Sequence, residues 1–456
     1  MTPASILAYL PSVSAGILIV HLLWPEGGWK AGWVKIFLGI GLGLGQASLL
    51  DFVYMLLFSS EKGFLFVQLA LLLGLLVVWI LREGKNLRFT IPRIRLSRLQ
   101  VLLLAGLVIV AGLSALSAIN VWMREPHGAW DAWMMFNRAA RFFYRDQPGW
   151  LGSFSRQMDP IFHADYPLQV GLNVAWAWQA VGQETQRVPI VLSGLFMLAC
   201  AGLLGASLGL TKSPGQAGVA LILLLGSSVI SNEGPSQRAD LPLAYFFLAT
   251  VVLIYLFVQL EKPNLLILAG FMAGLAAWTK NEGSPFILIT FLALLIAFLR
   301  RKPWRVLGPY LVGLIIPLAI VLYFKEFLAP PSDVLSNGLT RSLQQALDWS
   351  RHVTILKSFA ADFLSFGGWG IGILPILLAY ALVFKPALSP ELRPACLAIG
   401  LILVLQALGY YGIYLITPYE LQWHIDFSLN RLVFQLYVPF LFLFFAVVTD
   451  VEKALT

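Results

Sequence analysis

The sequence predicts an all-α polytopic membrane protein of about 13 transmembrane helices. Hydrophobic residues make up 59% of the 456 residues, charged residues make up only 12%, and the mean hydropathy is +0.81. A soluble domain carries about 25% charged residues. Long apolar runs, such as residues 102–119, approach the ~20 residues with which a helix crosses a bilayer. These observations exclude a soluble globular domain.

Thirteen apolar segments are long enough, or nearly so, to cross the membrane as helices. They are residues 4–24, 31–58, 63–81, 101–122, 187–208, 217–231, 241–260, 265–279, 286–300, 306–325, 361–384, 395–415 and 432–449. The first three spans and the basic loop after them form a unit over 1–100. The remaining spans form a second unit over 101–456, and the long polar loops lie in this second unit.

Two basic segments set the expected orientation. Residues 82–98 hold six Lys and Arg against one Glu, and residues 300–305 hold four with no acid. Basic loops stay on the cytoplasmic side of a membrane. Alternate counting from these loops places the N-terminus outside, the C-terminus inside, and the two long loops 123–186 and 326–360 outside. Most of the 23 acidic residues then lie on the extracytoplasmic side.

The first long loop is predicted to contain two helices that lie along the membrane surface. The pattern from 130 to 144 is helical: Arg138, Arg141 and the following Arg145 share one helical face, at spacings i, i+3 and i+7, and apolar residues occupy another. The segment 168–182 follows a proline and carries Trp176 and Trp178, which suit the headgroup region. At about 15 residues, this second helix is short for a span.

Asp131 is the first residue that could carry chemistry. It follows the fourth span directly, and Trp130 and Trp133 limit its access to water. A carboxylate in such surroundings can have a raised pKa and can act as a general base. The alternative is that Asp131 only caps the helix that follows, because an acid near a helix N-terminus is stabilising.

Two further corners carry polar residues just before a helix. The sequence "HADYP" contains His163, Asp165 and Tyr166, and "RADLP" contains Arg238 and Asp240. Both aspartates could be helix caps. The functional alternative is substrate binding, in which the arginine would contact a phosphate.

The last two corners carry charged residues next to apolar helices. Lys280 and Glu282 lie at the outer end of one span, where they could face a cavity or form an ion pair with each other. In "WHIDFSLNR", His424 and Arg431 share one helical face. The arginine could bind a phosphate, or it could extend to the outer headgroups.

Several function classes lack their sequence signatures. No P-loop, GxGxxG or GxSxG motif is present, which argues against nucleotide-driven transport and against a serine hydrolase. Cys200 and Cys396 lie in apolar runs and read as core residues. The five histidines are too scattered for a metal site, so no cofactor is required. The net charge of +8 fits basic cytoplasmic loops and does not indicate nucleic acid as a partner.

Taken together, these corners resemble the GT-C class of polytopic glycosyltransferases that use polyprenyl-phosphate sugars. This class includes the protein O-mannosyltransferases and the lipid A aminoarabinose transferases, and the chain resembles an uncharacterised bacterial branch of it. The resemblance covers about 101–440. It rests on "WDAW" around Asp131, "DYP" at 165–167, "RADLPLA" at 238–244, "AAWTKNEG" at 276–283 and "WHIDFSLNR" at 423–431.

The resemblance implies a GT-C-like catalytic core in which Asp131 is the catalytic residue. It implies inverting transfer of a sugar from a polyprenyl-phosphate donor to a hydroxyl on a lipid, glycan or protein, at the extracytoplasmic face of a bacterial inner membrane. Family members often carry a second acid beside the first, whereas Ala132 stands here, so a divalent metal is doubtful. The alternatives are a glycolipid flippase, a membrane scaffold, and a lipid-linked glycan polymerase or ligase that uses Arg341, Arg351 and His352.

Overall fold

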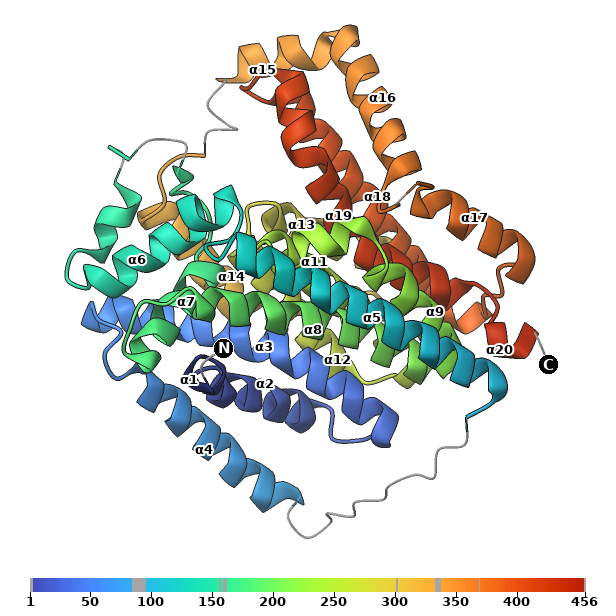
Figure 1. The fold of residues 1–456 in the computed structure, drawn as a ribbon, viewed down its shortest axis with the longest axis horizontal. Coiled ribbons are helices and arrows are strands. Elements are labelled where there is room, and N and C mark those ends of the chain that lie inside the picture. The colour runs from blue at the N-terminus through green and yellow to red at the C-terminus, as the bar shows by residue number, and fades with distance from the viewer. Residues whose placement is uncertain are drawn as a thin grey trace.

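The computed structural model describes residues 3–83, 96–155, 157–158, 162–300, 302–332, 338–368 and 370–454. Helices make up most of this part of the chain (Figure 1). They are α1 (Pro3–Leu7), α2 (Leu10–Leu23), α3 (Trp29–Phe58), α4 (Phe64–Glu83), α5 (Arg98–Arg124), α6 (Asn137–Arg145), α7 (Gln169–Val181), α8 (Arg187–Thr211), α9 (Pro214–Leu225), α10 (Ser228–Glu233), α11 (Asp240–Leu260), α12 (Pro263–Thr279), α13 (Gly283–Phe298), α14 (Trp304–Phe327), α15 (Gly338–Leu347), α16 (Trp349–Ser365), α17 (Ile373–Phe384), α18 (Arg393–Ile416), α19 (Leu421–Val447) and α20 (Val451–Ala454).

The helices confirm an all-α polytopic membrane protein. Within the described ranges, nine helical segments are long and apolar enough to cross a membrane, and four shorter apolar helices accompany them. Each predicted span coincides with at least part of one of these helices. Most of the basic segment 82–98, on which the predicted orientation depends, lies outside the described residues.

Two predicted spans are wrong as single helices. The segment 361–384 is divided into the end of α16 and all of α17, because the glycine-rich stretch 366–372 interrupts it and Gly367 adopts a φ of +66°. The segment 217–231 is divided into α9 and α10, because the Ser227 hydroxyl accepts a hydrogen bond from the Ile230 amide at 3.2 Å and starts a new helix. The last span begins at Leu421, eleven residues before the predicted start at Leu432.

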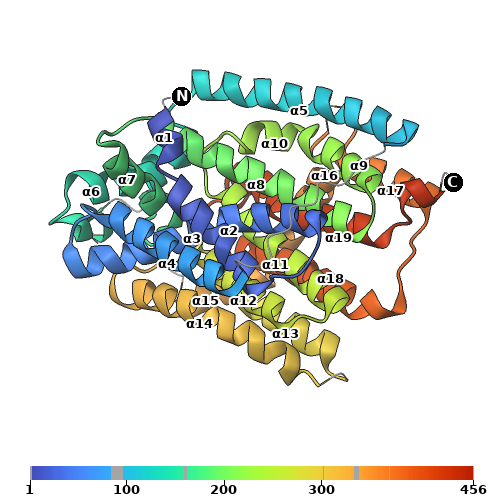
Figure 2. The same ribbon diagram turned by 90° about the horizontal axis from the view of Figure 1, so that it is seen from below.

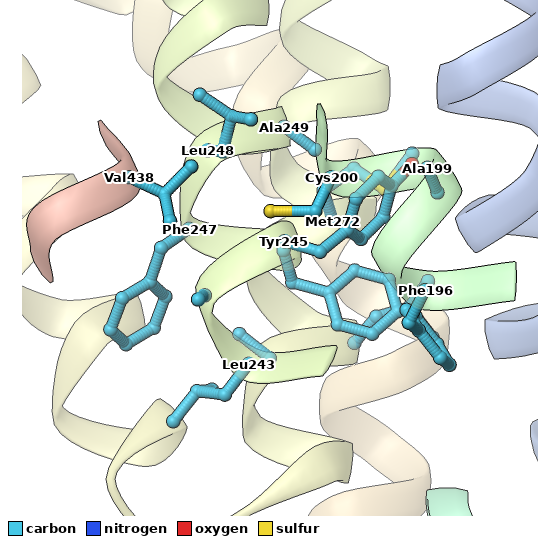
Figure 3. Packing of buried hydrophobic residues seen from close by; sticks show 14 of the residues in the cluster. Phe196, Ala199, Cys200, Leu243, Tyr245, Phe247, Leu248, Ala249, Met272 and Val438 are labelled. Atoms are coloured by element: carbon cyan, nitrogen blue, oxygen red, sulfur yellow. The ribbon is translucent and has the colours of Figure 1, made fainter. Parts of the chain in front are cut away.

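Helix α11 forms the centre of the bundle. Every residue from Asp240 to Leu256 is buried, which agrees with a helix that is apolar on all sides. Figure 3 shows its side chains packed against residues of α8, α12 and α19, among them Cys200, Met272 and Val438. Both cysteines are free and buried, as expected of core residues.

The three N-terminal helices differ in how they pack. Helices α2 and α3 cross at close range, since a Cβ atom on Gly16 would lie 2.2 Å from the carbonyl oxygen of Gly39. The Tyr9 hydroxyl donates to the carbonyl of Asn173 at 3.0 Å, and this bond ties the N-terminal region to α7. Helix α4 is mostly exposed and lies at the edge of the bundle (Figure 1).

One end of the bundle collects the polar corners. Helices α6 and α7 lie at this end, and α20 and the C-terminus lie at the opposite end (Figure 1). At the α6–α7 end, α5 finishes, α11 begins, and α12 passes into α13. Helix α19 starts beside α15 and carries Arg431, ten residues from its first residue, to Asp131 (Figure 1). Segments distant in the sequence therefore meet at one end of the bundle.

Candidate functional site

A tight turn places Asp131 between α5 and α6. Gly128 adopts a φ of +79°, and the Ala129 amide donates to the carbonyl of Ser236 at 3.0 Å, which fixes the turn against the α10–α11 connection. A π-helical turn over Ala132–Phe136 follows and leads into α6. Helices therefore occupy most of the predicted segment 130–144, and α7 occupies most of the predicted segment 168–182. The π turn widens the helix directly beside Asp131.

Asp131 does not cap this helix through its side chain, so the capping interpretation is wrong. The carboxylate instead accepts a short hydrogen bond from Nη1 of Arg431. The Nε atom of Arg238 lies 4.0 Å from the same oxygen, Oδ2. Asp131 is 6% exposed, and it therefore lies in a buried ion-pair network with two guanidinium groups.

Arg431 points into the protein, and the interpretation that it extends to the headgroups is wrong. It is 9% exposed, and its Nη1 atom lies 3.7 Å from Oδ2 of Asp240 in addition to its bond with Asp131. Its guanidinium also lies over the ring of Phe427, 4.9 Å from the centroid. Arg431 thus links the carboxylates of Asp131 and Asp240, which are far apart in the sequence.

Asp240 is the most deeply buried charged residue of the network. Its Oδ1 atom accepts hydrogen bonds from Nζ of Lys280 at 2.9 Å and from Nε2 of Gln435 at 2.6 Å. Lys280 also pairs with Glu282 at 2.8 Å, so the predicted local ion pair is present. Because Asp240 is 1% exposed and has three polar partners, it holds Lys280 and Arg431 in position.

Arg238 completes the network from the start of α11. Its Nη1 atom donates to both carboxylate oxygens of Glu233, at 3.0 and 3.3 Å. Burial raises the pKa of the Glu233 carboxyl, and the charge of Arg238 acts in the opposite direction. The structure therefore brings Asp131, Arg238 and Asp240 together with Lys280, Glu282 and Arg431.

Four buried polar atoms of this network have no hydrogen-bond partner within the described residues. They are two carboxylate oxygens, Oδ1 of Asp131 and Oε2 of Glu282, and the Nε atoms of Arg238 and Arg431. An unpartnered buried polar group costs about 1–3 kcal/mol, and native structures contain few of them. Two free acceptors and two free donors in one cluster are typical of a site that binds a polar ligand.

The "DYP" corner packs beside this network through the loop after α12. The Asn281 amide donates to Oδ2 of Asp165 at 2.7 Å. Nζ of Lys325, at the end of α14, donates to the carbonyl of Asp165 at 2.5 Å and to Oδ1 of Asn281 at 2.6 Å. Because Asn281 lies between Lys280 and Glu282 in sequence, this contact fixes the loop that carries both.

His163 and Tyr166 line a small cavity of about 20 Å³ with Arg138. Their rings lie 5.0 Å apart. Burial lowers the pKa of Arg138 to about 10, and its guanidinium lies over the rings of Phe142 and Phe162. A cavity of this size accommodates roughly one water molecule.

His424 lies outside the network, nearer the start of α19. Its Nδ1 atom is 2.8 Å from the hydroxyl of Thr417, and its ring packs against those of Tyr414 and Tyr419. The shared helical face that predicted a link to Arg431 is real, but seven residues separate the two side chains along the helix.

Three members of the site were not predicted from the sequence. Gln435 is a polar residue in the otherwise apolar second half of α19, and Lys325 directly follows the apolar part of α14. A polar residue in such a place is the signal that would have indicated them. Glu233 lies in a corner that was recognised, but its pairing with Arg238 was not predicted. Across the described ranges, no three His, Cys, Asp or Glu side chains come together as a group that could hold a metal.

Residues 170–324, from α7 to α14, match the family model of the dolichyl-phosphate-mannose-protein mannosyltransferases. This match covers 155 of the 456 residues and supports a membrane glycosyltransferase of the GT-C class. The matched region contains Arg238, Asp240, Lys280 and Glu282, whereas Asp131 and Arg431 lie on either side of it. No curated protein and no solved structure matches the chain.

Proposed function

We propose that this glycosyltransferase moves a sugar from a polyprenyl-phosphate donor to an acceptor hydroxyl at the extracytoplasmic face of the membrane, with Asp131 as the general base. The acceptor hydroxyl attacks the anomeric carbon while its proton passes to Asp131. The bond from the anomeric carbon to the phosphate oxygen breaks, and the lipid phosphate leaves from the opposite side with inversion. The transition state has oxocarbenium-like character, as in other glycosyl transfers.

The free oxygen of Asp131 is the observation that carries this proposal. Oδ2 is held by Arg431, whereas Oδ1 is buried and has no partner among the described residues. A general base needs a lone pair that is held in a fixed orientation and is not already used by another donor. The ion pair fixes the carboxylate and leaves Oδ1 to accept the proton.

The departing phosphate needs positive charge that is already in place. Arg431 and Arg238 each have a free Nε donor close to Asp131, and Lys280 lies on the other side of Asp240. Loss of one preorganised ligand of this kind reduces the rate by roughly 10²–10³. Asp240 is too buried to contact a substrate directly and is therefore a positioning residue.

A lipid-linked glycan polymerase or ligase is the second candidate function. A polar pocket of about 420 Å³ lies between α15, α16 and the start of α19 and is lined by Arg341 and Arg351. The Arg351 guanidinium donates to the carbonyls of Tyr414 at 2.8 Å and Leu415 at 3.1 Å. The Nδ1 atom of His352 is hydrogen-bonded to the hydroxyl of Tyr411. This pocket could hold an extended acceptor or a diphosphate-linked donor.

A flippase is less well supported. Transporters of this kind carry polar groups on broken helices near the membrane midplane. In the network described above, Asp131, Asp240 and Lys280 instead lie where helices begin or end. Arg431 reaches them from a position ten residues into α19.

Transfer activity in proteoliposomes tests the proposal. The purified chain is offered a synthetic prenyl-phosphate monosaccharide or a prenyl-diphosphate oligosaccharide, with acceptors of the three classes. Transfer from the first donor supports the proposal, and transfer from the second alone supports the polymerase or ligase. Asp131→Asn should reduce the rate by roughly 10²–10⁴. Asp146→Asn, an exposed aspartate at the end of α6, is the matched control.

Sidedness needs a separate test. Cysteines introduced at the exposed positions Asp146 and Lys453 lie at opposite ends of the bundle. In oriented cells, an impermeant maleimide should label D146C and should label K453C only after permeabilisation. The reverse pattern would place the site on the cytoplasmic side.

A further inference from the structure

An apolar groove lies at the end of the bundle opposite the ion-pair network. Helices α3, α5, α8 and α9 line it, and its volume is about 470 Å³. Figure 2 shows α5 at the edge of the molecule, beside α8 and α9. The lining comes from the first turns of α3, the first half of α5, the second half of α8 and the length of α9. Leu103, Leu107, Ala206 and Leu221 are among its residues.

Small residues on α8 leave this space open. Ala201, Ala206 and Gly209 line the groove, and a Cβ atom on Gly209 would have its nearest neighbour at 4.0 Å. The volume falls within the range of about 300–1,000 Å³ that is typical of ligand-binding clefts. Because α3, α5 and α8 are long and apolar enough to cross a membrane and α9 is apolar, hydrocarbon chains are the molecules available to fill it.

The polar rim of the groove carries one cation. Lys30 lines the groove and is half-buried, and no carboxylate among the described residues pairs with it. Trp29 and Trp33 lie beside it and are 45% and 51% exposed. Exposed tryptophans mark the depth of the lipid headgroups. A basic group between transmembrane helices at this depth is suited to a lipid phosphate.

We propose that this groove binds an anionic phospholipid, with one acyl chain between α5 and α8 and its phosphate on Lys30. The alternative occupant is the polyprenyl-phosphate donor. From Leu103 to the end of α5 the helix rises about 30 Å, so a phosphate on Lys30 lies far from Asp131. The site is therefore distinct from the network, and the inference does not depend on the proposed function.

Native mass spectrometry of the purified full-length protein tests this binding. The delipidated protein is titrated with phosphatidylglycerol or phosphatidylcholine, and the bound lipids are counted. The wild type should retain phosphatidylglycerol more strongly. Lys30→Gln should weaken that retention about fivefold (about 1 kcal/mol) and leave phosphatidylcholine unchanged. Lys62→Gln, an exposed lysine at the other end of the bundle, should behave as the wild type.

A second variant tests the binding of the lipid's acyl chain, and not that of its headgroup. Ala206→Leu fills the groove and should weaken the retention of both lipids. Leu198→Phe, on an exposed face of α8 outside the groove, is its control. Unchanged phosphatidylglycerol retention in Lys30→Gln would overturn the proposal, whether or not Ala206→Leu folds. So would loss of polyprenyl-phosphate binding, with phosphatidylglycerol retained, in either groove variant.

Discussion

Replacement of Arg431 by glutamine should destabilise the protein far more than replacement of Asp131 by asparagine. Arg431 contacts Asp131 directly and lies 3.7 Å from Asp240. Two unit charges at 3.7 Å attract each other by about 4–5 kcal/mol at an effective dielectric constant of 20. Desolvation offsets part of this attraction, and removal of one partner of a buried pair costs about 3–5 kcal/mol. Glutamine would leave Asp131 with Arg238 alone, at 4.0 Å.

Asp131→Asn has a different effect on the charge balance. Arg431 would keep its ion pair with Asp240, and Arg238 would keep its ion pair with Glu233 at 3.0 Å. We therefore expect a loss of roughly 1 kcal/mol or less, together with the loss of transfer activity. The double variant, with both Asp131→Asn and Arg431→Gln, should be more stable than Arg431→Gln alone by about 0.5–3 kcal/mol. It no longer contains the Asp131 carboxylate, which loses its main ion-pair partner in Arg431→Gln.

Thermal unfolding in detergent, followed by tryptophan fluorescence, measures these differences. Arg431→Gln should lower the midpoint by roughly 5 °C or more. Equal decreases of the midpoint in the two single variants would refute this reasoning, and so would a double variant that is no more stable than Arg431→Gln. Either result would mean that Arg431 does not stabilise the protein through its ion pairs in the way described.

Three further predictions follow from contacts around the site. Gly128→Ala should lower the free energy of unfolding by about 1–3 kcal/mol and should reduce the rate of transfer. Gly128 has a left-handed backbone conformation in the turn before Asp131, and a Cβ atom there would lie 2.7 Å from that of Ala132. Gly152→Ala, in open space, should change neither the melting temperature nor the rate. Lys325→Met should reduce the rate by up to about 100-fold through misplacement of the loop after α12, while Lys357→Met, on an exposed face of α16, should not. Glu61 is buried beside a second carboxyl, and burial raises its pKa well above its ordinary value of 4.5. Its stabilising contribution is therefore complete below pH 4.5 and is lost as the pH rises through the folded pKa. Glu61→Gln should raise the melting temperature at pH 8 and flatten its pH dependence, and a wild-type protein that is more stable at pH 8 than at pH 5 would contradict this.

The sequence predicted much of the site because charged residues are costly in a membrane protein. Asp131, Lys280 and Arg431 each stand at the edge of an apolar run, and alternate counting of the spans placed them on one side. The structure brings them into one network. Their pairing could not be predicted, because it depends on how α11, α12 and α19 pack against one another.

Helix interruptions were harder to predict than helices. Hydropathy does not distinguish a continuous span from two helices joined by glycines, and the stretch 366–372 is apolar throughout. The capping interpretations of Asp131 and Asp240 were reasonable from local sequence. Neither side chain makes a cap, because a partner from a distant helix satisfies it instead.

The network holds one more acid than base among the described residues. Asp131, Glu233, Asp240 and Glu282 share only Arg238, Lys280 and Arg431. Under the proposed function, a lipid phosphate adds further negative charge to this network, and the unpartnered Nε donors of Arg238 and Arg431 are the groups left to bind it.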